Sequence, residues 1–246
     1  MDFNGQVAIV TGGAGGFGEA IVSELYKSGA FVYIFDYNIE EAVKIAERLN
    51  PQKVFTIQVD LSKVKEVEKA VNAVVEKSNK IDILVNNAGT SLGKPALDTI
   101  EDEWDRMMNL NLKGVFFLTQ LAAKNMVKHG GGKIVNVASV NALITENNTA
   151  VYSVSKAGVA YLTKALAREW ARYGIRVNAI APSYARTALT EKIFQDEKIY
   201  QGILKGIPAR RLVMPEEVAE AVLFLLSDKM GIMTGAVVPL DGAKST

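Results

Sequence analysis

The sequence predicts an α/β fold in which one parallel β-sheet is covered by helices on both faces. Short apolar runs bounded by turn residues alternate with helical patterns along the whole chain. Such runs are typical of strands buried on both faces, and the alternation is typical of strand–helix–strand units. No linker, low-complexity segment or further repeat interrupts the pattern. We therefore expect residues 1–246 to form a single domain, a Rossmann-type doubly wound sheet of about seven strands.

The expected elements follow one another regularly up to residue 182. The expected strands are the apolar runs at 6–10, 31–35, 53–59, 81–89, 133–138, 175–181 and 235–243. The expected helices open near Gly18 and cover 40–49, 62–77, about 104–128, a stretch reaching Tyr173, and 215–226. Pro215 suits the first position of the last helix. After Pro182 the pattern loosens, and the charged stretch 187–214, broken by glycine and Pro208, predicts a mobile insertion.

Composition and charge exclude several functional classes. The 246 residues carry 28 basic and 27 acidic side chains spread along the chain, which is unlike a nucleic-acid binder or a polybasic membrane anchor. No apolar run approaches the length of about 18 residues expected of a membrane span, and the first residues lack the pattern of a signal peptide. With no cysteine and one histidine, His129, a zinc–thiolate or multi-histidine metal site is excluded. We expect a cytoplasmic protein with no metal, nucleic-acid or membrane partner.

A glycine-rich turn follows the first expected strand. The stretch TGGAGGFG (11–18) places Gly12, Gly16 and Gly18 where a helix opens. Glycines permit a tight turn and the close approach of a pyrophosphate, and the helix N-terminus offers free N–H groups. A glycine turn by itself is weak evidence, because many strand–helix turns contain one.

Asp36 strengthens that interpretation. It ends the second expected strand, 18 residues after Gly18, where a carboxylate can accept hydrogen bonds from an adenosine ribose and would repel a 2′-phosphate. Neither Gly15 nor Tyr37 supplies the basic side chain that a 2′-phosphate needs. The sequence therefore predicts NAD rather than NADP, although Asp36 can also serve as an N-cap of the next helix.

A second set of polar residues follows the fifth expected strand. Tyr152 and Lys156 are four residues apart in a helical pattern and therefore share one helix face. A neighbouring positive charge favours the phenolate of a tyrosine, whose ordinary pKa is about 10. Ser139 lies where the strand ends, a usual place for a site residue in an open α/β sheet. A solvated lysine beside a half-buried aromatic would show the same spacing.

Together these residues resemble the short-chain dehydrogenase/reductase family. The similar blocks are TGGAGGFG, NNAG (86–89), LNLKG (110–114), Ser139 with Tyr152 and Lys156, IRVNAIAPS (175–183) and PEEVAEAVLFL (215–225). They occur in the family's order over nearly the whole chain. Phe17 stands where the family usually has isoleucine, and Ser183 replaces the usual glycine after Pro182.

The resemblance implies hydride transfer between an alcohol or carbonyl and a nicotinamide. It makes Tyr152 the general acid/base. Lys156 would lower the tyrosine pKa and hold the nicotinamide ribose. Ser139 would stabilise charge on the substrate oxygen, and Asn111 would hold a water in a proton relay.

The resemblance also implies the residues that bind the cofactor. They are Gly12, Gly16, Phe17, Gly18, Asp36, Asp60, Leu61, Asn87, Tyr152, Lys156 and Thr187. Asp60 would contact the adenine, Asn87 the adenosine ribose and Thr187 the carboxamide end. Each polar residue has a structural alternative: Asp60 can cap the helix near Ser62, and Asn87 or Asn111 can tie adjacent strands together.

Two functions from other classes are weighed against this interpretation. Residues 89–93 match the G-x-S-x-G pattern of serine hydrolases, but Lys94-Pro95 disfavours the helix that must follow Ser91. A non-enzymatic dinucleotide sensor can share the fold, yet such proteins usually lack the tyrosine or the lysine, and both are present.

The substrate and the assembly are inferred from resemblance. The run 169–187 is similar to gluconate 5-dehydrogenase-like enzymes, which favours a polyol, sugar or sugar acid; the alternative is a 3-oxoacyl-carrier-protein reductase. The pocket is expected from 91–96, 140–148 and the insertion at 185–214, where Asn141, Thr145, Glu146, Asn147 and Asn148 are polar. A homotetramer is expected, for which Val159, Leu162 and Leu166 can serve as an interface or pack on the sheet instead.

Overall fold

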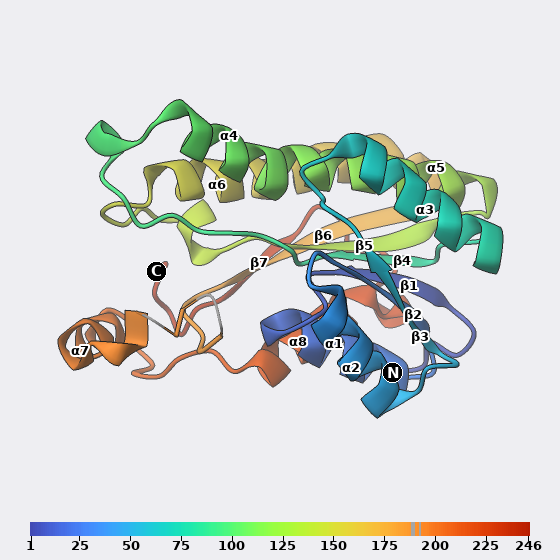
Figure 1. The fold of residues 1–246 in the computed structure, drawn as a ribbon, viewed down its shortest axis with the longest axis horizontal. Coiled ribbons are helices and arrows are strands. Elements are labelled where there is room, and N and C mark those ends of the chain that lie inside the picture. The colour runs from blue at the N-terminus through green and yellow to red at the C-terminus, as the bar shows by residue number, and fades with distance from the viewer. Residues whose placement is uncertain (188–189, 192) are drawn as a thin grey trace.

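The computed structural model describes residues 1–187, 190–191 and 193–246 and contains a seven-stranded sheet (Figure 1). The strands are β1 (Val7–Thr11), β2 (Phe31–Asp36), β3 (Val54–Gln58), β4 (Ile83–Asn86), β5 (Gly132–Val137), β6 (Ile175–Pro182) and β7 (Val237–Leu240). Their order is β3-β2-β1-β4-β5-β6-β7, and every pairing is parallel. The predicted doubly wound parallel sheet is confirmed.

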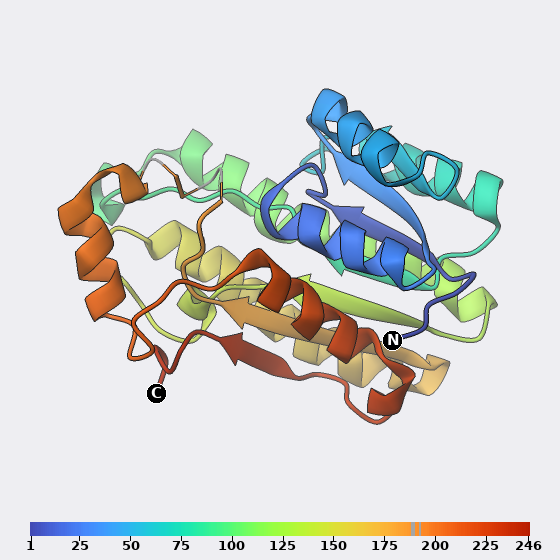
Figure 2. The same ribbon diagram turned by 90° about the horizontal axis from the view of Figure 1, so that it is seen from below.

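Helices cover both faces of this sheet. They are α1 (Gly16–Lys27), α2 (Ile39–Leu49), α3 (Val64–Ser78), α4 (Glu101–Met108), α5 (Val115–Lys128), α6 (Ala150–Trp170), α7 (Glu197–Lys205) and α8 (Pro215–Leu226). Helices α1, α2 and α8 lie on one face, which Figure 2 shows from the front, and α3, α5 and α6 lie on the other.

The pleat of the strands divides the core into two layers. In β1, Ala8 and Val10 pack with α1 and α8, whereas Val7 and Ile9 pack with α3 and α5. Because successive residues are buried on opposite faces, the strands read as continuous apolar runs in the sequence. No helix in the described part of the chain is long and apolar enough to cross a membrane.

The helix predicted at about 104–128 is interrupted. Helix α4 ends at Met108, a π-helical turn follows at Asn109–Gly114, and α5 begins at Val115. A Cβ on Gly114 would overlap the carbonyl oxygen of Leu61, so glycine allows this turn to approach the chain after β3. The turn carries Asn111, and π-helical turns often mark functional sites.

The segment 185–214 contains an element that the sequence pattern did not predict. Helix α7 begins after Asp196, whose carboxylate accepts hydrogen bonds from the N–H groups of Lys198 and Ile199. A bridge between Ala185 and Val213 closes the segment at its base. Residues 188–189 and 192, for which mobility was predicted, lie outside the described residues.

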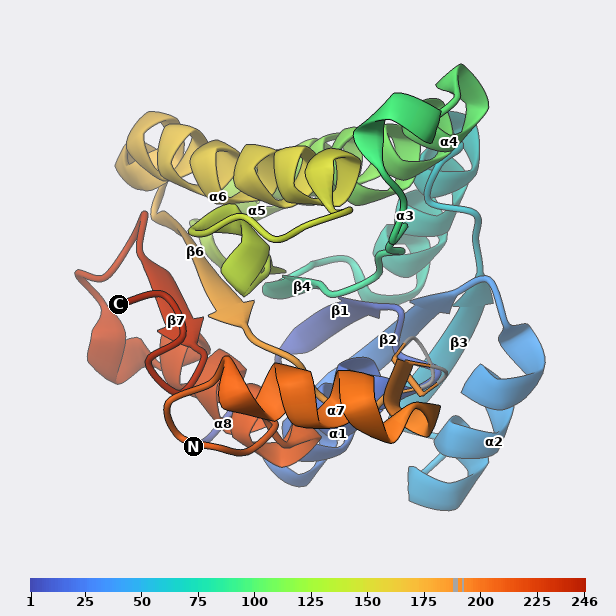
Figure 3. The ribbon, with the colours of Figure 1, turned by 90° about the vertical axis from the view of Figure 1, so that its left-hand side faces the viewer.

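Since all strands are parallel, their carboxyl ends share one edge of the sheet. Figure 3 looks onto that edge, with α7 below the strands in front of α1 and α8, and α6 above the strands. Open α/β sheets bind their ligands at this edge.

Candidate active site

The predicted catalytic residues meet at the carboxyl edge of the sheet. Ser139 directly follows the last residues of β5 and begins a short 3₁₀ turn. Tyr152 and Lys156 occupy the first turns of α6, and Asn111 comes from the π-helical turn. Two connections therefore supply one polar cluster at the carboxyl ends of β4 and β5: the β4–β5 connection carries Asn111, and the β5–β6 connection carries the other three residues.

Lys156 is the most deeply buried cation of this cluster. The residue is 5% exposed, and its ammonium donates a hydrogen bond of 2.9 Å to the Val137 carbonyl. Burial lowers the pKa of Lys156 to about 8. With this pKa the ammonium still carries its charge at neutral pH. It lies 5.9 Å from the centroid of the Tyr152 ring.

Tyr152 is half-buried beside Ser139. Burial raises the pKa of Tyr152, the hydrogen bond with Ser139 lowers it, and the negative charge of Glu146 raises it further. The net shift is upward, so the phenol is protonated near neutral pH in the chain alone. The lowering of this pKa by Lys156, which the resemblance implies, stays a prediction.

Asn111 is fixed by hydrogen bonds from both ends of its carboxamide. Its Oδ1 accepts a 2.9 Å hydrogen bond from the Thr90 N–H, and its Nδ2 donates to the Thr90 carbonyl and to Ser155 Oγ. A Cβ on Gly89 would lie 3.3 Å from Asn111 Oδ1 and 3.3 Å from Lys156 Nζ. Glycine at this position thus leaves a small space that both polar groups border. Asn111 therefore forms the structural tie between neighbouring segments that the sequence allowed, and its role in a proton relay stays a prediction.

The glycine turn has the shape of a phosphate cradle. Gly12 and Gly16 adopt φ angles of +62° and +56°, which favour glycine. A Cβ on Gly18 would overlap the Gly12 carbonyl oxygen. Helix α1 begins here, and Gly15 at its N-cap has no side chain to occupy the first N–H groups. A diphosphate fits this cradle by charge and by space.

Asp36 is positioned by backbone donors. Its Oδ2 accepts from the Ala14 N–H and its Oδ1 from the Asn38 N–H, both at 2.9 Å. Each carboxylate oxygen has two acceptor sites, so each keeps one for a ribose hydroxyl. The first of these bonds also links Asp36 to the glycine turn, which brings the two predicted parts of the cofactor site together.

The other predicted cofactor residues have structural contacts of their own. Asn87 donates to the carbonyls of Thr11 and Gly12 at 3.0 Å, and so ties β4 to the glycine turn. Asp60 accepts hydrogen bonds from Ser62, which outweigh the effect of burial and lower the pKa of Asp60. Helix α3 begins at Val64 with Lys63 as its N-cap and without a side-chain cap hydrogen bond, so the capping role that the sequence left open for Asp60 is not observed.

Thr187 is brought over the glycine turn, since a Cβ on Gly16 would meet its methyl group at 3.3 Å. Phe17 and Leu61 contribute their side chains to the core, Phe17 to the layer with α1 and Leu61 to the layer with α3. Among the described residues, the buried Ser183 hydroxyl has no hydrogen-bond partner. It follows Pro182 at the carboxyl end of β6, which leaves a free polar group at the same edge.

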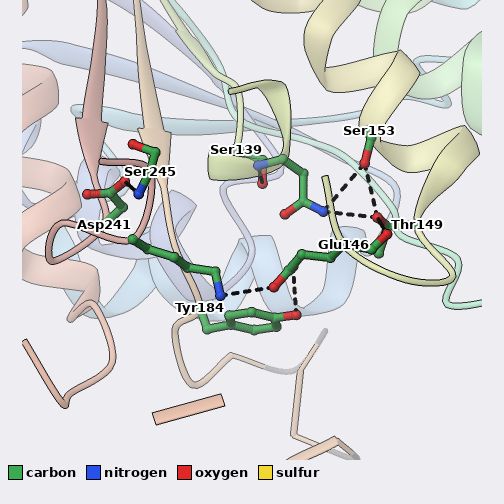
Figure 4. Close-up of polar contacts among 9 residues, drawn as sticks. Ser139, Glu146, Thr149, Ser153, Tyr184, Asp241 and Ser245 are labelled. Atoms are coloured by element: carbon green, nitrogen blue, oxygen red, sulfur yellow. Dashed lines mark hydrogen bonds and ion pairs between the residues drawn. The ribbon is translucent and has the colours of Figure 1, made fainter. Parts of the chain in front are cut away.

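A further cluster of polar residues was not predicted as a set. Glu146 Oε2 accepts a 2.9 Å hydrogen bond from the Tyr184 hydroxyl, and Glu146 Oε1 forms a 2.9 Å ion pair with Lys244 (Figure 4). The sequence indicated Glu146 as one of several polar loop residues, but 38 and 98 residues separate it from its two partners. No local spacing signals such a contact.

The hydrolase alternative lacks its geometry. The chain between β4 and Ala96 forms no helix, so Ser91 does not stand at the start of one. His129 ends α5 before β5 begins, whereas Ser91 follows the end of β4. Because these neighbouring strands are parallel, the two residues lie at opposite edges of the sheet. Within the described residues, no cluster of acidic and histidine side chains has the makings of a metal site.

Comparison with known proteins matches this fold. A family described as enoyl-(acyl carrier protein) reductase, of the short-chain type, matches residues 12–243. The chain belongs to the short-chain dehydrogenase/reductase family. It is therefore an oxidoreductase of a family whose members bind nicotinamide dinucleotides.

Three relatives show how broad the family is around this chain. An NAD-dependent glycerol dehydrogenase of Listeria innocua is 42% identical over 244 residues, covering 98% of this chain and 95% of the relative. A 3-oxoacyl-(acyl-carrier-protein) reductase of Thermotoga maritima is 40% identical, covering 98% of both. The structure of a gluconate 5-dehydrogenase from Burkholderia cenocepacia, in complex with NADP and tartrate, has a TM-score of 0.95 at 32% identity and covers 99% and 96% of the two chains. The short-chain dehydrogenase/reductase fold is thus shared by proteins with different substrates and cofactors.

Proposed function

We propose that the chain interconverts a secondary alcohol and a ketone with NAD, and that its substrate is a polyol, sugar or sugar acid. The observation that carries the proposal is the convergence of Tyr152, Ser139 and buried Lys156 on the strand edge that also holds the glycine turn and Asp36. These are a proton-transfer group, an oxygen-binding group and a dinucleotide cradle in one place.

The residues present fit the dinucleotide. The glycine turn and the N-terminus of α1 would hold the diphosphate, and the open acceptor sites of Asp36 would hold the adenosine ribose. Asp60, Leu61, Asn87 and Thr187 would complete the site, as the resemblance implies. Asp36 supports NAD over NADP because a second negative charge at the 2′ position would lie against its carboxylate.

The protein's own groups handle the proton. When bound, the nicotinamide supplies the acceptor for the hydride of the alcohol, or its donor in the reverse direction. Tyr152 takes the hydroxyl proton of the alcohol during oxidation and returns it to the carbonyl oxygen during reduction. Ser139 donates a hydrogen bond to the same oxygen and stabilises charge that develops there.

Lys156 and Asn111 support that proton transfer. The buried ammonium favours the phenolate of Tyr152 through its charge and would hold the nicotinamide ribose. The space above Gly89, between Asn111 and Lys156, would hold the relay water that carries the proton away from the site.

A 3-oxoacyl-carrier-protein reductase is the second candidate, supported by the Thermotoga maritima relative. The glycerol dehydrogenase relative supports the polyol instead, and it is NAD-dependent as Asp36 suggests for this chain.

We also propose a cytoplasmic homotetramer. Val159 and Leu166 are 2% and 4% exposed, so they pack on the chain's own sheet and do not supply the interface. The outward face of α6 exposes Val154 and Tyr161 at 48% and 75%, and this face suits an interface between copies better. Light scattering measures the assembly.

The reaction is tested by following NADH formation over polyols, sugar acids and simple alcohols, with reduction of 3-oxoacyl thioesters assayed in parallel. We expect turnover with NAD on a hydroxyl-rich substrate. Activity restricted to acyl thioesters with NADPH would refute both the substrate class and the role of Asp36.

A further inference from the structure

The cluster of Glu146, Tyr184 and Lys244 is assembled from three distant parts of the chain. Glu146 belongs to the loop between Ser139 and Tyr152, Tyr184 follows β6, and Lys244 belongs to the C-terminal turn after β7. The Lys244 side chain is 9% exposed and that of Glu146 is 22% exposed. The ammonium of Lys244 also lies 5.4 Å from the centroid of the Tyr184 ring.

Hydrogen bonds within the C-terminal turn fix the position of Lys244. The carboxylate of Asp241 accepts hydrogen bonds from the N–H groups of Ala243, at 3.0 Å, and Ser245, at 2.9 Å. Figure 4 shows the contact with Ser245. The Lys244 N–H donates to the Asp241 carbonyl. The turn thus holds its lysine toward Glu146 and does not leave it in solvent.

The carboxylate of Glu146 is held on the same side of the site as Tyr152. The Glu146 carbonyl accepts a 2.8 Å hydrogen bond from Thr149 Oγ1, which fixes the loop at the start of α6, the helix that carries Tyr152. In agreement with this placement, the negative charge of Glu146 contributes to raising the pKa of both Tyr152 and Tyr184. Among the other polar residues of the loop, Asn141 is turned to Thr149 and Ser153. The remaining ones, at positions 145, 147 and 148, are exposed. Glu146 is therefore the loop residue best placed to meet a substrate beside Tyr152.

The chemistry of this carboxylate selects hydrogen-bond donors. Its two oxygens have about four acceptor sites, of which Tyr184 and Lys244 fill two. A hydroxyl next to the reacting carbon can donate to a free site. A 3-oxoacyl thioester offers only acceptor oxygens around its ketone, so it has no donor for this carboxylate. The carboxylate of a sugar acid would be repelled by Glu146, and Lys244 does not offset that repulsion because its charge is already paired with Glu146.

We propose that Glu146 is the specificity-determining residue, accepting a hydrogen bond from the hydroxyl next to the reacting carbon of an uncharged polyol, and that Lys244 and Tyr184 position it. The inference rests on the proposed NAD-linked oxidation and narrows its substrate class.

Two substrates that differ by one hydroxyl test the proposal: 1,2-propanediol and 2-propanol, each assayed with NAD by steady-state kinetics. The wild type is expected to prefer the diol. Glu146→Ala should lower kcat/KM for the diol by about 10- to 100-fold, the effect of losing a hydrogen bond to a charged group, with 2-propanol changed less than about twofold. Lys244→Met should raise KM for the diol more than it lowers kcat, and Lys244→Arg should restore most of the preference.

Asp228→Asn is the matched control, because it also removes the carboxylate of an ion pair with a lysine, Lys133. It should leave the preference for the diol unchanged. Thermal melting and NADH fluorescence show whether each variant folds and binds cofactor; if Glu146→Ala does not fold, the isosteric Glu146→Gln should still reduce the preference by about 2- to 10-fold.

An equal loss on both substrates, no loss on either, or a wild type without preference for the diol would overturn the proposal for Glu146. A wild type that oxidises neither alcohol nor any polyol with NAD would refute the proposed function itself. The two failures are therefore distinguishable.

Discussion

The two halves of the carboxyl edge are built differently. On the half that we propose for the cofactor, the backbone makes the site: the glycine turn, the start of α1 and the end of β2 are set within 26 residues of chain, Thr11 to Asp36. On the half that we propose for the substrate, side chains make it: Glu146, Tyr184 and Lys244 meet across 98 residues of chain. The difference teaches that the cofactor half depends on glycine geometry, whereas the substrate half depends on paired charges that a single substitution can change.

The largest expected effect is on turnover, from substitution of Tyr152, which lies between the two halves. Tyr152→Phe removes the proton donor and should cut turnover by the 10²- to 10⁴-fold typical of a general acid/base, while NAD affinity changes little. Stopped-flow or steady-state NADH absorbance and an NAD titration measure the two quantities. Tyr161→Phe, on the exposed face of the same helix, is the control. Turnover that survives in Tyr152→Phe would show that the proton donor is another group.

Lys156 should leave a signature in stability as well as in catalysis. Burial lowers its pKa to about 8 from an ordinary 10.5, so between these values the unfolded chain holds a proton that the folded chain has released. Wild-type stability should therefore rise with pH across this window, and below about pH 8 the chain bears the full cost of the buried charge, roughly 3 kcal/mol.

Lys156→Met removes that dependence. The free energy of unfolding is measured with urea at pH 7.5 and 9.5 for the wild type and the variant. From the lower to the higher pH, the wild type should gain about 2 kcal/mol of stability relative to the variant. A difference that is constant with pH would mean that the ammonium is better solvated than its contacts indicate.

The glycine turn offers a matched pair of substitutions. Gly18→Ala places a Cβ on the Gly12 carbonyl oxygen and should cost about 1–3 kcal/mol of stability and weaken NAD binding. Gly15→Ala meets no atom within 4 Å in an extended backbone, so it should change both quantities little. Equal effects of the two would contradict a backbone-built cradle. Chemical denaturation and calorimetric titration with NAD measure them.

Substitution of Asp36 should give the smallest of these effects, and it tests how the proposed cofactor site distinguishes NAD from NADP. Asp36→Asn keeps the shape but removes the charge, so NADP should gain relative to NAD by about 10- to 100-fold in kcat/KM, the range for an interaction with a charged group. An unchanged ratio would show that some other group discriminates at the 2′ position.

What the sequence could predict follows the same division. The strands, the glycine turn and the helical spacing of Tyr152 and Lys156 are set by neighbours in the chain, so the patterns found them. The π-helical turn at Asn109–Gly114 was missed because it depends on contact between Gly114 and the chain near Leu61, about 50 residues earlier.

Helix α7 was missed because its charged, glycine-interrupted stretch resembles a loop, although Asp196 is a recognisable N-cap. The partners of Glu146 were missed because no spacing links residues brought together only by the order of β5, β6 and β7. Val159 and Leu166 had two readings in the sequence, and burial in the chain's own core decides between them.

A crystal structure of the dead-end complex with NADH and 1,2-propanediol tests the account most directly. It should show the adenosine ribose on Asp36, the reacting hydroxyl between Tyr152 and Ser139, and the second hydroxyl within hydrogen-bond distance of Glu146. A diol bound with its second hydroxyl away from Glu146, or a ribose that does not touch Asp36, would contradict it.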